Sequence, residues 1–116
     1  GEGREVAGVS LVARAVGDTT VDALRSMLDT VREKLPSGVA VLGGRTDGKA
    51  CFVACVSPDL VQQGVHAGHL LRDVARMAGG GGGGAPHKAQ AGGKYGSKVE
   101  AAIDAVPGLL EKMRSA

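Results

Sequence analysis

The hydrophobic positions in the first third of the chain follow two different periods. Residues 6–16 are dense in β-branched apolar side chains, which predicts a strand over that stretch. From Val21 to Leu35, apolar residues recur every three or four positions, the period of an amphipathic helix. Thr19 with Asp22 three positions later resembles a capping box, so we expect the helix to begin there. The polar face of this helix, which includes Arg25, is expected to lie in solvent.

Two further apolar stretches, residues 39–44 and residues 50–56, are separated by a turn signal. Asp47-Gly48 suits the left-handed angles of a tight hairpin turn, so we expect two antiparallel strands. In the second stretch both alternating sets of side chains are apolar, which is typical of a strand that is covered on both faces. Residues 50–56 are therefore predicted to form the central strand of a sheet.

Two helical patterns follow. Ser57-Pro58-Asp59 is a typical helix start, and Gly64 interrupts the short helix that it begins. A second helical pattern covers residues 66–78 and ends at the glycine run, residues 79–84.

The last third of the chain predicts one weak strand and a helical carboxyl end. Residues 86–91 form a short segment, after which Ser97 and Glu100 resemble another capping box. Pro107 predicts a kink, or two helices joined end to end. The expected order is β-α-β-β-α-(β)-α. A chain of 116 residues forms one domain, so we predict a single domain of the α/β (α+β) class, with a mixed sheet packed against helices.

Charge singles out one segment of the chain. The formal net charge is only +2, but residues 74–99 contain no acidic residue and the rest of the chain sums to −2. The basic residues of this segment are Arg76, Lys88, Lys94 and Lys98. A positive field concentrated on one segment attracts a polyanion.

The six consecutive glycines, Gly79 to Gly84, have two interpretations. One is a flexible linker. However, the run begins at the end of a predicted helix, and the small residues at positions 89–93 are typical of backbone that lies close to another surface. Successive backbone N–H groups bind phosphate and other anions. We therefore favour a surface that a phosphate-rich ligand approaches closely.

The common nucleotide-binding motifs do not match this segment. A Walker A loop ends in Gly-Lys-Ser/Thr, whereas Gly84 precedes Ala85 and Lys94 precedes Tyr95. The glycine run satisfies G-x-G-x-x-G but follows a helix rather than a strand. We expect no site for a nucleoside triphosphate or a dinucleotide.

Other reactive residues suggest no chemistry. His66 and His69 lack further metal ligands nearby, and no serine or cysteine has a His/Asp partner at a recognisable spacing, so we expect no metal site and no catalytic residue. Cys51 and Cys55, on one predicted strand, are too far apart to form a disulfide and are expected to be buried thiols. No apolar run is long enough to cross a membrane, so we predict a cytoplasmic protein.

Several motifs, taken in order, resemble a known family. They are Leu24-Arg25 to Asp29, Val39 to Leu42, Asp47-Gly48-Lys49, Val56 to Leu60, His66-Ala67-Gly68, and the glycine run with Ala-Gln-Ala-Gly-Gly at positions 89–93. From Val6 onward the chain resembles the globular part of the C-terminal domain of bacterial alanyl-tRNA synthetases, a member of the DHH-associated superfamily. The glycine run with the segment at 89–93 is the most specific part of the resemblance.

This resemblance implies a mixed-sheet fold and a role in tRNA binding. Such a domain grips the outer corner, or elbow, of tRNA(Ala), where the D and T loops meet, and supports aminoacylation and editing without performing catalysis. The implied partners are the tRNA(Ala) elbow and the catalytic and editing domains of the parent synthetase. The catalytic, editing and helical dimerisation regions of the parent are absent from residues 1–116. We therefore expect a monomer without the ATP, Mg and Zn that the other domains use.

The predicted RNA-binding residues combine the glycine run, the basic segment and the resemblance. They are Arg76, Gly80, Gly81, Gly82, Gly83, Gly84, His87, Lys88, Gln90, Gly92, Gly93, Lys94 and Lys98. The family usually has Arg-Pro-Asp after the glycines, where this chain has Ala85-Pro86-His87. Loss of the arginine weakens or redistributes the phosphate or base contact at that point. His87 in place of an acid makes the segment more favourable to an anion. Tyr95 is the one possible stacking residue, and partial burial is the alternative.

Two other functions fit parts of the sequence. The accessory substrate-binding domain of a DHH-type phosphodiesterase or exonuclease also carries a glycine-rich loop. Those proteins place histidine next to the glycines, whereas His87 lies three residues after Gly84. A protein-interaction or structural tail, with the glycines as spacer, is the third interpretation.

Overall fold

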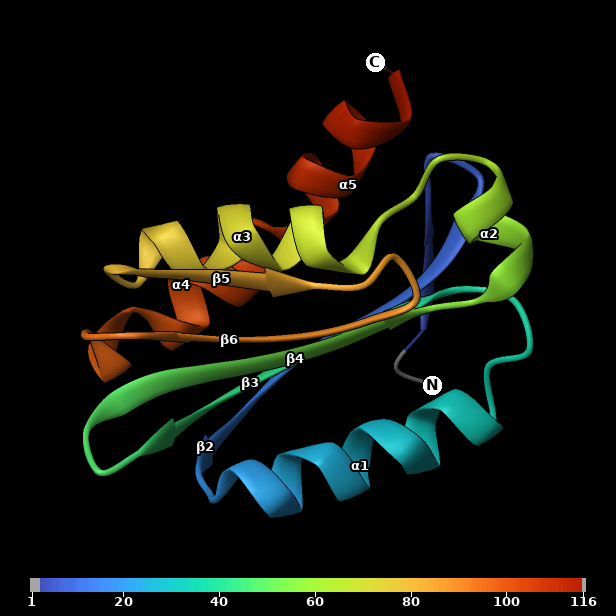
Figure 1. Ribbon diagram of the computed structural model, residues 1–116. Helices are drawn as coiled ribbons and strands as arrows, with labels where there is room; N and C mark the ends of the chain where they lie inside the picture. Colours follow the sequence, from blue (N-terminus) through green and yellow to red (C-terminus); the bar gives the residue numbers. More distant parts are fainter. Residues whose placement is uncertain (1–2, 116) are drawn as a thin grey trace.

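A mixed sheet runs through the centre of the molecule, and helices cover both of its faces (Figure 1). A computed structural model describes residues 3–115. Its elements are β1 (Arg4–Val6), β2 (Val9–Asp18), α1 (Val21–Glu33), β3 (Val39–Thr46), β4 (Lys49–Val56), α2 (Pro58–Gln62), α3 (Ala67–Met77), β5 (Gly80–Gly84), β6 (Lys88–Gly93), the 3₁₀ helix η1 (Gly96–Lys98), α4 (Val99–Asp104) and α5 (Val106–Ser115). The α+β class and the single domain predicted from the sequence are confirmed.

The strand order in the sheet is β1-β2-β3-β4-β6-β5. Strands β2 and β3 are parallel because α1 crosses between them, and each of the other neighbouring pairs is antiparallel. Strand β4 lies between β3 and β6, so the prediction that residues 50–56 form a central strand is confirmed. Strand β5 lies at one edge.

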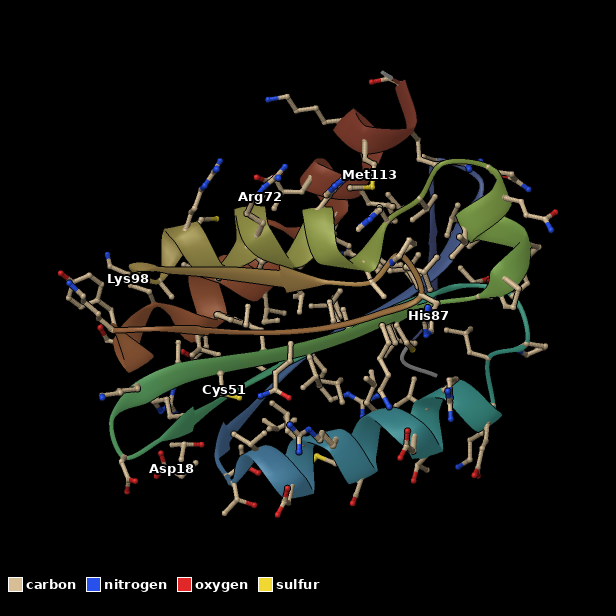
Figure 2. The ribbon with its side chains drawn as sticks, in the orientation of Figure 1. Asp18, Cys51, Arg72, His87, Lys98 and Met113 are labelled. Carbon is tan, nitrogen blue, oxygen red and sulfur yellow. The ribbon has the colours of Figure 1, made fainter. Side chains whose placement is uncertain are left out.

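Two apolar cores occupy the two faces of the sheet. The larger core joins one face of β4, centred on the fully buried Phe52, to α3, α4 and α5. The smaller core joins the opposite face of β4, which bears Cys51, Val53 and Cys55, to Leu24 and Leu28 of α1. In Figure 2 the labelled Cys51 lies between the sheet and α1. Both faces of β4 are therefore covered, as its doubly apolar pattern predicts.

The amino-terminal region differs from the prediction in two respects. Residues 6–16 do not form one strand, because Ala7 and Gly8 adopt positive φ angles of 51° and 78° and turn β1 back onto β2. The N-cap of α1 is Thr20, whose Oγ1 accepts a hydrogen bond from Ala23 N–H at 3.1 Å. Thr19 is not the cap: its Oγ1 donates to the carbonyl oxygen of Thr20 at 3.4 Å, and its N–H, which donates to the carbonyl oxygen of Arg45, holds it beside β3.

The predicted turns and helix ends are correct at two places and wrong at a third. Asp47 and Gly48, with φ of 52° and 78°, form the two-residue turn between β3 and β4. Two helices meet end to end before Pro107, since α4 ends at Asp104 and α5 begins at Val106. Ser97, however, does not cap a helix: it lies within η1, and α4 begins after it without a side-chain cap.

The glycine run is not a flexible linker after α3, which was one of its two interpretations, but an edge strand. Gly79, with φ of 75°, turns the chain at the end of α3, and Gly80–Gly84 then pairs with Lys88–Gly93. The weak strand predicted near residues 86–91 corresponds to β6, which begins two residues later, at Lys88. The run is therefore an ordered element of the sheet rather than a linker.

Candidate nucleic-acid interface

The candidate surface is the hairpin of β5 and β6, residues 80–93, which we call the glycine hairpin. On β6, Ala89 and Ala91 are buried in the larger core, whereas Lys88, Gln90 and Gly92 are exposed on the opposite side. Directly paired residues share a face, so Gly81, the partner of Gly92, lies with the exposed set. We call this side the open face. Helix α1 packs on β3 and β4 and reaches this side through the side chains of Arg25 and Asp29 (Figure 1).

The turn of the glycine hairpin is fixed by the first residues of α3. Ala67 N–H donates to the carbonyl oxygen of Pro86 at 2.8 Å, and Gly68 N–H donates to that of Ala85 at 3.2 Å. These two N–H groups belong to the helix start, where they have no partner within the helix. The same bonds place α3 directly against β5.

Most of the glycines are explained by this packing. Gly82, Gly83 and Gly84 have φ angles of 136°, 159° and 149°, a region that other residues rarely adopt. A Cβ at Gly80 would overlap the carbonyl oxygen of Gly92, and a Cβ on Gly68 of α3 would overlap that of Gly84. The fold therefore requires glycine at these positions, whatever the hairpin binds.

Gly81 is different. A Cβ at this position meets nothing within 4 Å among the described residues, and its φ lies outside the left-handed region. Its partner Gly92 is likewise open, since a Cβ there would make only an ordinary 3.5 Å contact with the carbonyl oxygen of Ala50. Packing and backbone angle do not account for glycine at Gly81, on the open face.

The outer edge of β5 supplies backbone groups as well. Ala85 N–H donates to the carbonyl oxygen of Lys88 at 2.9 Å, which identifies this pair as a hydrogen-bonded one. Hydrogen-bonded and non-bonded pairs alternate in antiparallel strands. The N–H and C=O groups of Gly80, Gly82 and Gly84 therefore point away from β6. Those of Gly84 face Gly68 of α3, whereas Gly82 is exposed.

Gln90 occupies the middle of the open face and is held by α1. Arg25 donates to Gln90 Oε1 from both Nε, at 2.9 Å, and Nη2, at 2.6 Å. Because the oxygen of the amide is taken, its NH₂ group is the donor that the open face presents. Arg25 also forms an ion pair with Asp22 at 3.4 Å.

Two hollows flank Gln90. One, of about 370 Å³, lies between α1 and the hairpin and is lined by Arg25, Gly83 and Lys88 among others. The other, of about 510 Å³, extends toward the turn between β3 and β4 and is lined by Lys49, Gly81 and Gly92 among others. The open face is therefore a hollowed surface, with cationic side chains at its border.

The predicted basic residues do not gather at one point. Figure 2 shows His87 and Lys98 at opposite ends of the hairpin. Lys88 lies at the start of β6 with His87, whereas Lys94 follows its end, about 20 Å away for six extended residues. Arg76, in the last turn of α3, is also at this second end, because Tyr95 N–H bonds to the carbonyl oxygen of Ala78. The positive charge borders the hairpin at both ends.

Two of these cations have acidic neighbours. Lys88 Nζ lies 3.9 Å from Asp29 Oδ1, and Arg76 Nη1 lies 3.4 Å from Asp73 Oδ1. All four side chains are exposed by at least 38%. Such solvated ion pairs are weak, so both cations can exchange their partner for a phosphate.

His66 and His69 have a structural role. His66 is the N-cap of α3, and its Nδ1 accepts a hydrogen bond from His69 N–H at 3.0 Å. The two rings stack with their centroids 3.6 Å apart. Desolvation, followed by the neighbouring His69 and Arg72, lowers the pKa of His66. The cap requires a neutral imidazole ring, since a protonated Nδ1 cannot accept a hydrogen bond.

The two cysteines are free and buried, as the strand spacing predicts. Burial raises the pKa of both thiols, and nearby Arg25 and Arg32 offset this only in part. Across residues 3–115, no group of three potential His, Cys, Asp or Glu metal ligands is present, and no helix there is long and apolar enough to cross a membrane.

Arg25 is the residue of this surface that the sequence did not predict. Its position on the polar side of α1 indicates only solvent exposure, and its partner Gln90 lies 65 positions later. No local pattern predicts a contact over that separation.

Comparison with known proteins places the chain in a family. The DHHA1 domain family matches residues 8–112. The alanine–tRNA ligase of Natranaerobius thermophilus is 46% identical over 98% of this chain, and that of Alkaliphilus metalliredigens is 42% identical over 91%. The chain spans only 12–13% of the length of these relatives.

Solved structures agree with the sequence relatives. The C-Ala domain of Aquifex aeolicus alanyl-tRNA synthetase matches with a TM-score of 0.81 and 27% identity, covering 94% of this chain and 97% of that domain. A DHH-domain protein described as a member of a family of ribosomal proteins matches with a TM-score of 0.54 and 15% identity, which shows a related fold alone.

The chain therefore belongs to the DHHA1 domain family. Within that family, its sequence and fold are similar to the C-terminal C-Ala domain of alanyl-tRNA synthetases along nearly the whole chain.

Proposed function

We propose that this chain is the tRNA-binding C-terminal domain of an alanine–tRNA ligase, and that it grips the elbow of tRNA(Ala). The observation that carries the proposal is the open face of the glycine hairpin. It joins bare backbone at Gly81 and Gly92, the amide of Gln90 and cations at both ends of β6. Structured RNA is recognised by its shape, its phosphates and its 2′-hydroxyls, and backbone and amide donors bind these groups.

In this role the domain positions tRNA and performs no chemistry. The aminoacylation and editing sites, with their ATP, Mg and Zn, belong to other domains of the parent synthetase. We expect the domain itself to need no cofactor, to act as a monomer, and to work in the cytoplasm with tRNA and the parent synthetase as its partners.

Binding measurements with four RNA and nucleotide probes test this proposal. We expect the chain to bind a full-length tRNA(Ala) transcript, and to bind a minihelix of the acceptor stem without the D and T loops at least about tenfold more weakly. Equal affinity for both would contradict elbow recognition. Tighter binding of a short single strand or a cyclic dinucleotide than of tRNA would instead assign the hairpin to the substrate of a DHH-type phosphodiesterase.

A further inference from the structure

Tyr95 lies at the carboxyl end of the glycine hairpin, where its backbone is fixed on both sides. Its N–H donates to the carbonyl oxygen of Ala78 at 2.9 Å, and the N–H of the next residue, Gly96, donates to that of Gly48 at 3.0 Å. These bonds hold the segment between the end of α3 and the turn that joins β3 to β4. The position of Tyr95 is therefore set by two separate parts of the fold.

The ring of Tyr95 rests against Gly79. A Cβ at Gly79 would overlap the Cδ2 and Cε2 atoms of the ring, so the absence of a side chain makes room for it. Gly79 also has a φ of 75°, which favours glycine independently. Backbone at Gly79 thus supports part of the ring, and the residue as a whole is about half exposed.

Tyr95 is unusually exposed for this chain. It is 54% exposed, whereas Phe52, the other Phe, Tyr or Trp residue, is fully buried. Met77, the last residue of α3, is 44% exposed. Among the described residues these are the two most exposed large apolar side chains. Tyrosine is enriched at binding interfaces, where its ring supplies apolar contact and its hydroxyl stays in water.

The surroundings of Tyr95 are mainly cationic. Lys94 precedes it, Lys98 follows within η1, and Arg76 lies at the adjoining end of α3. Two acids lie nearby. Asp73 is the ion-pair partner of Arg76, and Asp47 precedes Gly48, whose carbonyl oxygen accepts the hydrogen bond from Gly96 N–H. Arg45, which lies beside Gly96, is paired with Glu100 at 2.8 Å. With that pair counted, four cations and three acids lie at this end of the hairpin, so the balance stays positive.

We propose that Tyr95 is a stacking platform for an exposed nucleobase of the RNA, with Lys94 and Lys98 on the adjoining phosphates. This inference rests on the proposed function and specifies one contact within it. A base that is unstacked, or that ends a stack, presents a flat face, and aromatic side chains of RNA-binding domains stack on such faces. Loops of structured RNA carry unstacked bases of this kind.

The chain provides its own probe of this contact. Tyr95 is its single tyrosine and there is no tryptophan, so the intrinsic fluorescence of the chain comes from this ring. Titration with full-length tRNA(Ala) is expected to quench the emission by more than half at saturation. N-acetyltyrosinamide at the same RNA concentrations corrects for absorption by the RNA. Affinity is measured separately by filter binding.

Two substitutions distinguish stacking from apolar packing. Tyr95→Phe keeps the ring, and its affinity for tRNA is expected to stay within twofold of the wild-type value. Tyr95→Leu keeps an apolar side chain without the ring, and its affinity is expected to fall about tenfold, a typical loss for one stacked base. Circular dichroism establishes that both variants are folded.

The outcomes separate the two proposals. If wild-type chain does not bind tRNA, the proposed function itself fails. If tRNA binds without quenching, and Tyr95→Leu binds as tightly as wild type, the stacking platform is wrong while the tRNA-binding function stands. If Tyr95→Leu alters only the sedimentation of the RNA-free chain, the ring serves a protein contact, which also overturns the platform.

Discussion

Arg25 donates two hydrogen bonds to the side-chain oxygen of Gln90, and through them helix α1 fixes the polarity of the open face of the glycine hairpin. An unheld glutamine amide turns freely and presents either an acceptor or a donor. With its oxygen occupied by a guanidinium, Gln90 presents N–H donors, which match phosphate, 2′-hydroxyl and base carbonyl oxygens. Arg25 is therefore expected to act on RNA both through its charge and through Gln90.

Replacing Arg25 with Met keeps the apolar stem and removes the guanidinium. The affinity for tRNA is expected to fall about fivefold, while the free energy of unfolding changes by less than about 1 kcal/mol, because the side chain of Arg25 is half exposed. A double-mutant cycle with Gln90→Ala measures the coupling. If the two substitutions lower the affinity additively, Arg25 does not position Gln90.

Gly81 distinguishes the two reasons for glycine in β5, which are close packing within the fold and close approach of a ligand. Since a Cβ at Gly81 meets no described atom within 4 Å, Gly81→Ala and Gly81→Leu are expected to unfold within about 1 kcal/mol of wild type in urea titrations. The leucine, projecting from the open face, is expected to lower tRNA affinity at least tenfold. Wild-type affinity in folded Gly81→Leu would remove the open face from the binding site.

Gly68→Ala is the matched structural control. Its Cβ would overlap the backbone of Gly84, so we expect α3 to be displaced from β5 and the free energy of unfolding to fall by about 1–3 kcal/mol. Urea titration measures this loss. A wild-type midpoint for Gly68→Ala would contradict the close packing of α3 on the glycine strand.

The cap at His66 makes the stability of the chain depend on pH. The pKa of His66 is lowered in the folded chain, so on acidification the unfolded chain binds the proton first. Stability is expected to be complete above the ordinary pKa of about 6.5 and to decrease as the pH falls from there toward the folded pKa. Thermal melts between pH 7.5 and pH 5 measure the effect.

Two variants isolate this cap. His66→Ala is expected to lose about 1 kcal/mol at pH 7.5. His66→Asn retains an acceptor that does not titrate in this range, so it should keep the stability and lose the part of the pH dependence that His66 causes. An unchanged pH profile in His66→Asn would assign the acid sensitivity to another group.

Cys51 and Cys55 are expected to resist alkylation in the folded chain. Each is at most 6% exposed, and burial raises the pKa of each thiol, so little reactive thiolate reaches solvent. Iodoacetamide at pH 8 should modify neither residue within a time that modifies both in urea. Cys51 lines the hollow of about 510 Å³ together with Lys49 and Gly81. Rapid labelling of native Cys51 would show that this hollow opens further.

The sequence predicted the fold where the signal is local. Asp47-Gly48 encodes its own turn, and the doubly apolar stretch at 50–56 encodes a strand buried on both faces. Prediction from the sequence failed where tertiary packing determines the local structure. The turn at Ala7 lacks a typical turn residue at that position, and the choice between Thr19 and Thr20 as cap depends on the bond from Thr19 to Arg45 on β3.

In the candidate site, too, local signals were predictive and tertiary contacts were not. The basic, acid-free segment and the small residues of β6 identified the glycine hairpin, but glycine has no side chain from which to predict a strand. That five glycines form an edge strand depends on α3 packing against them, through Gly68. The contact between Arg25 and Gln90 is set by the order of strands in the sheet, which places β6 beside β4 and within reach of α1.

The measurement that tests the central claim most directly is the tRNA(Ala) affinity of Lys88→Glu/Lys94→Glu, against Lys34→Glu/Lys112→Glu as control. The control changes the net charge equally at two exposed positions, neither of which lines the hollows beside Gln90. For wild type, four phosphate contacts predict a log–log salt slope of about −3. The hairpin variant should bind about 100-fold more weakly or not at all and have a shallower slope, while the control stays within a fewfold of wild type. Equal affinity of the two double variants would contradict the assignment of tRNA binding to the glycine hairpin.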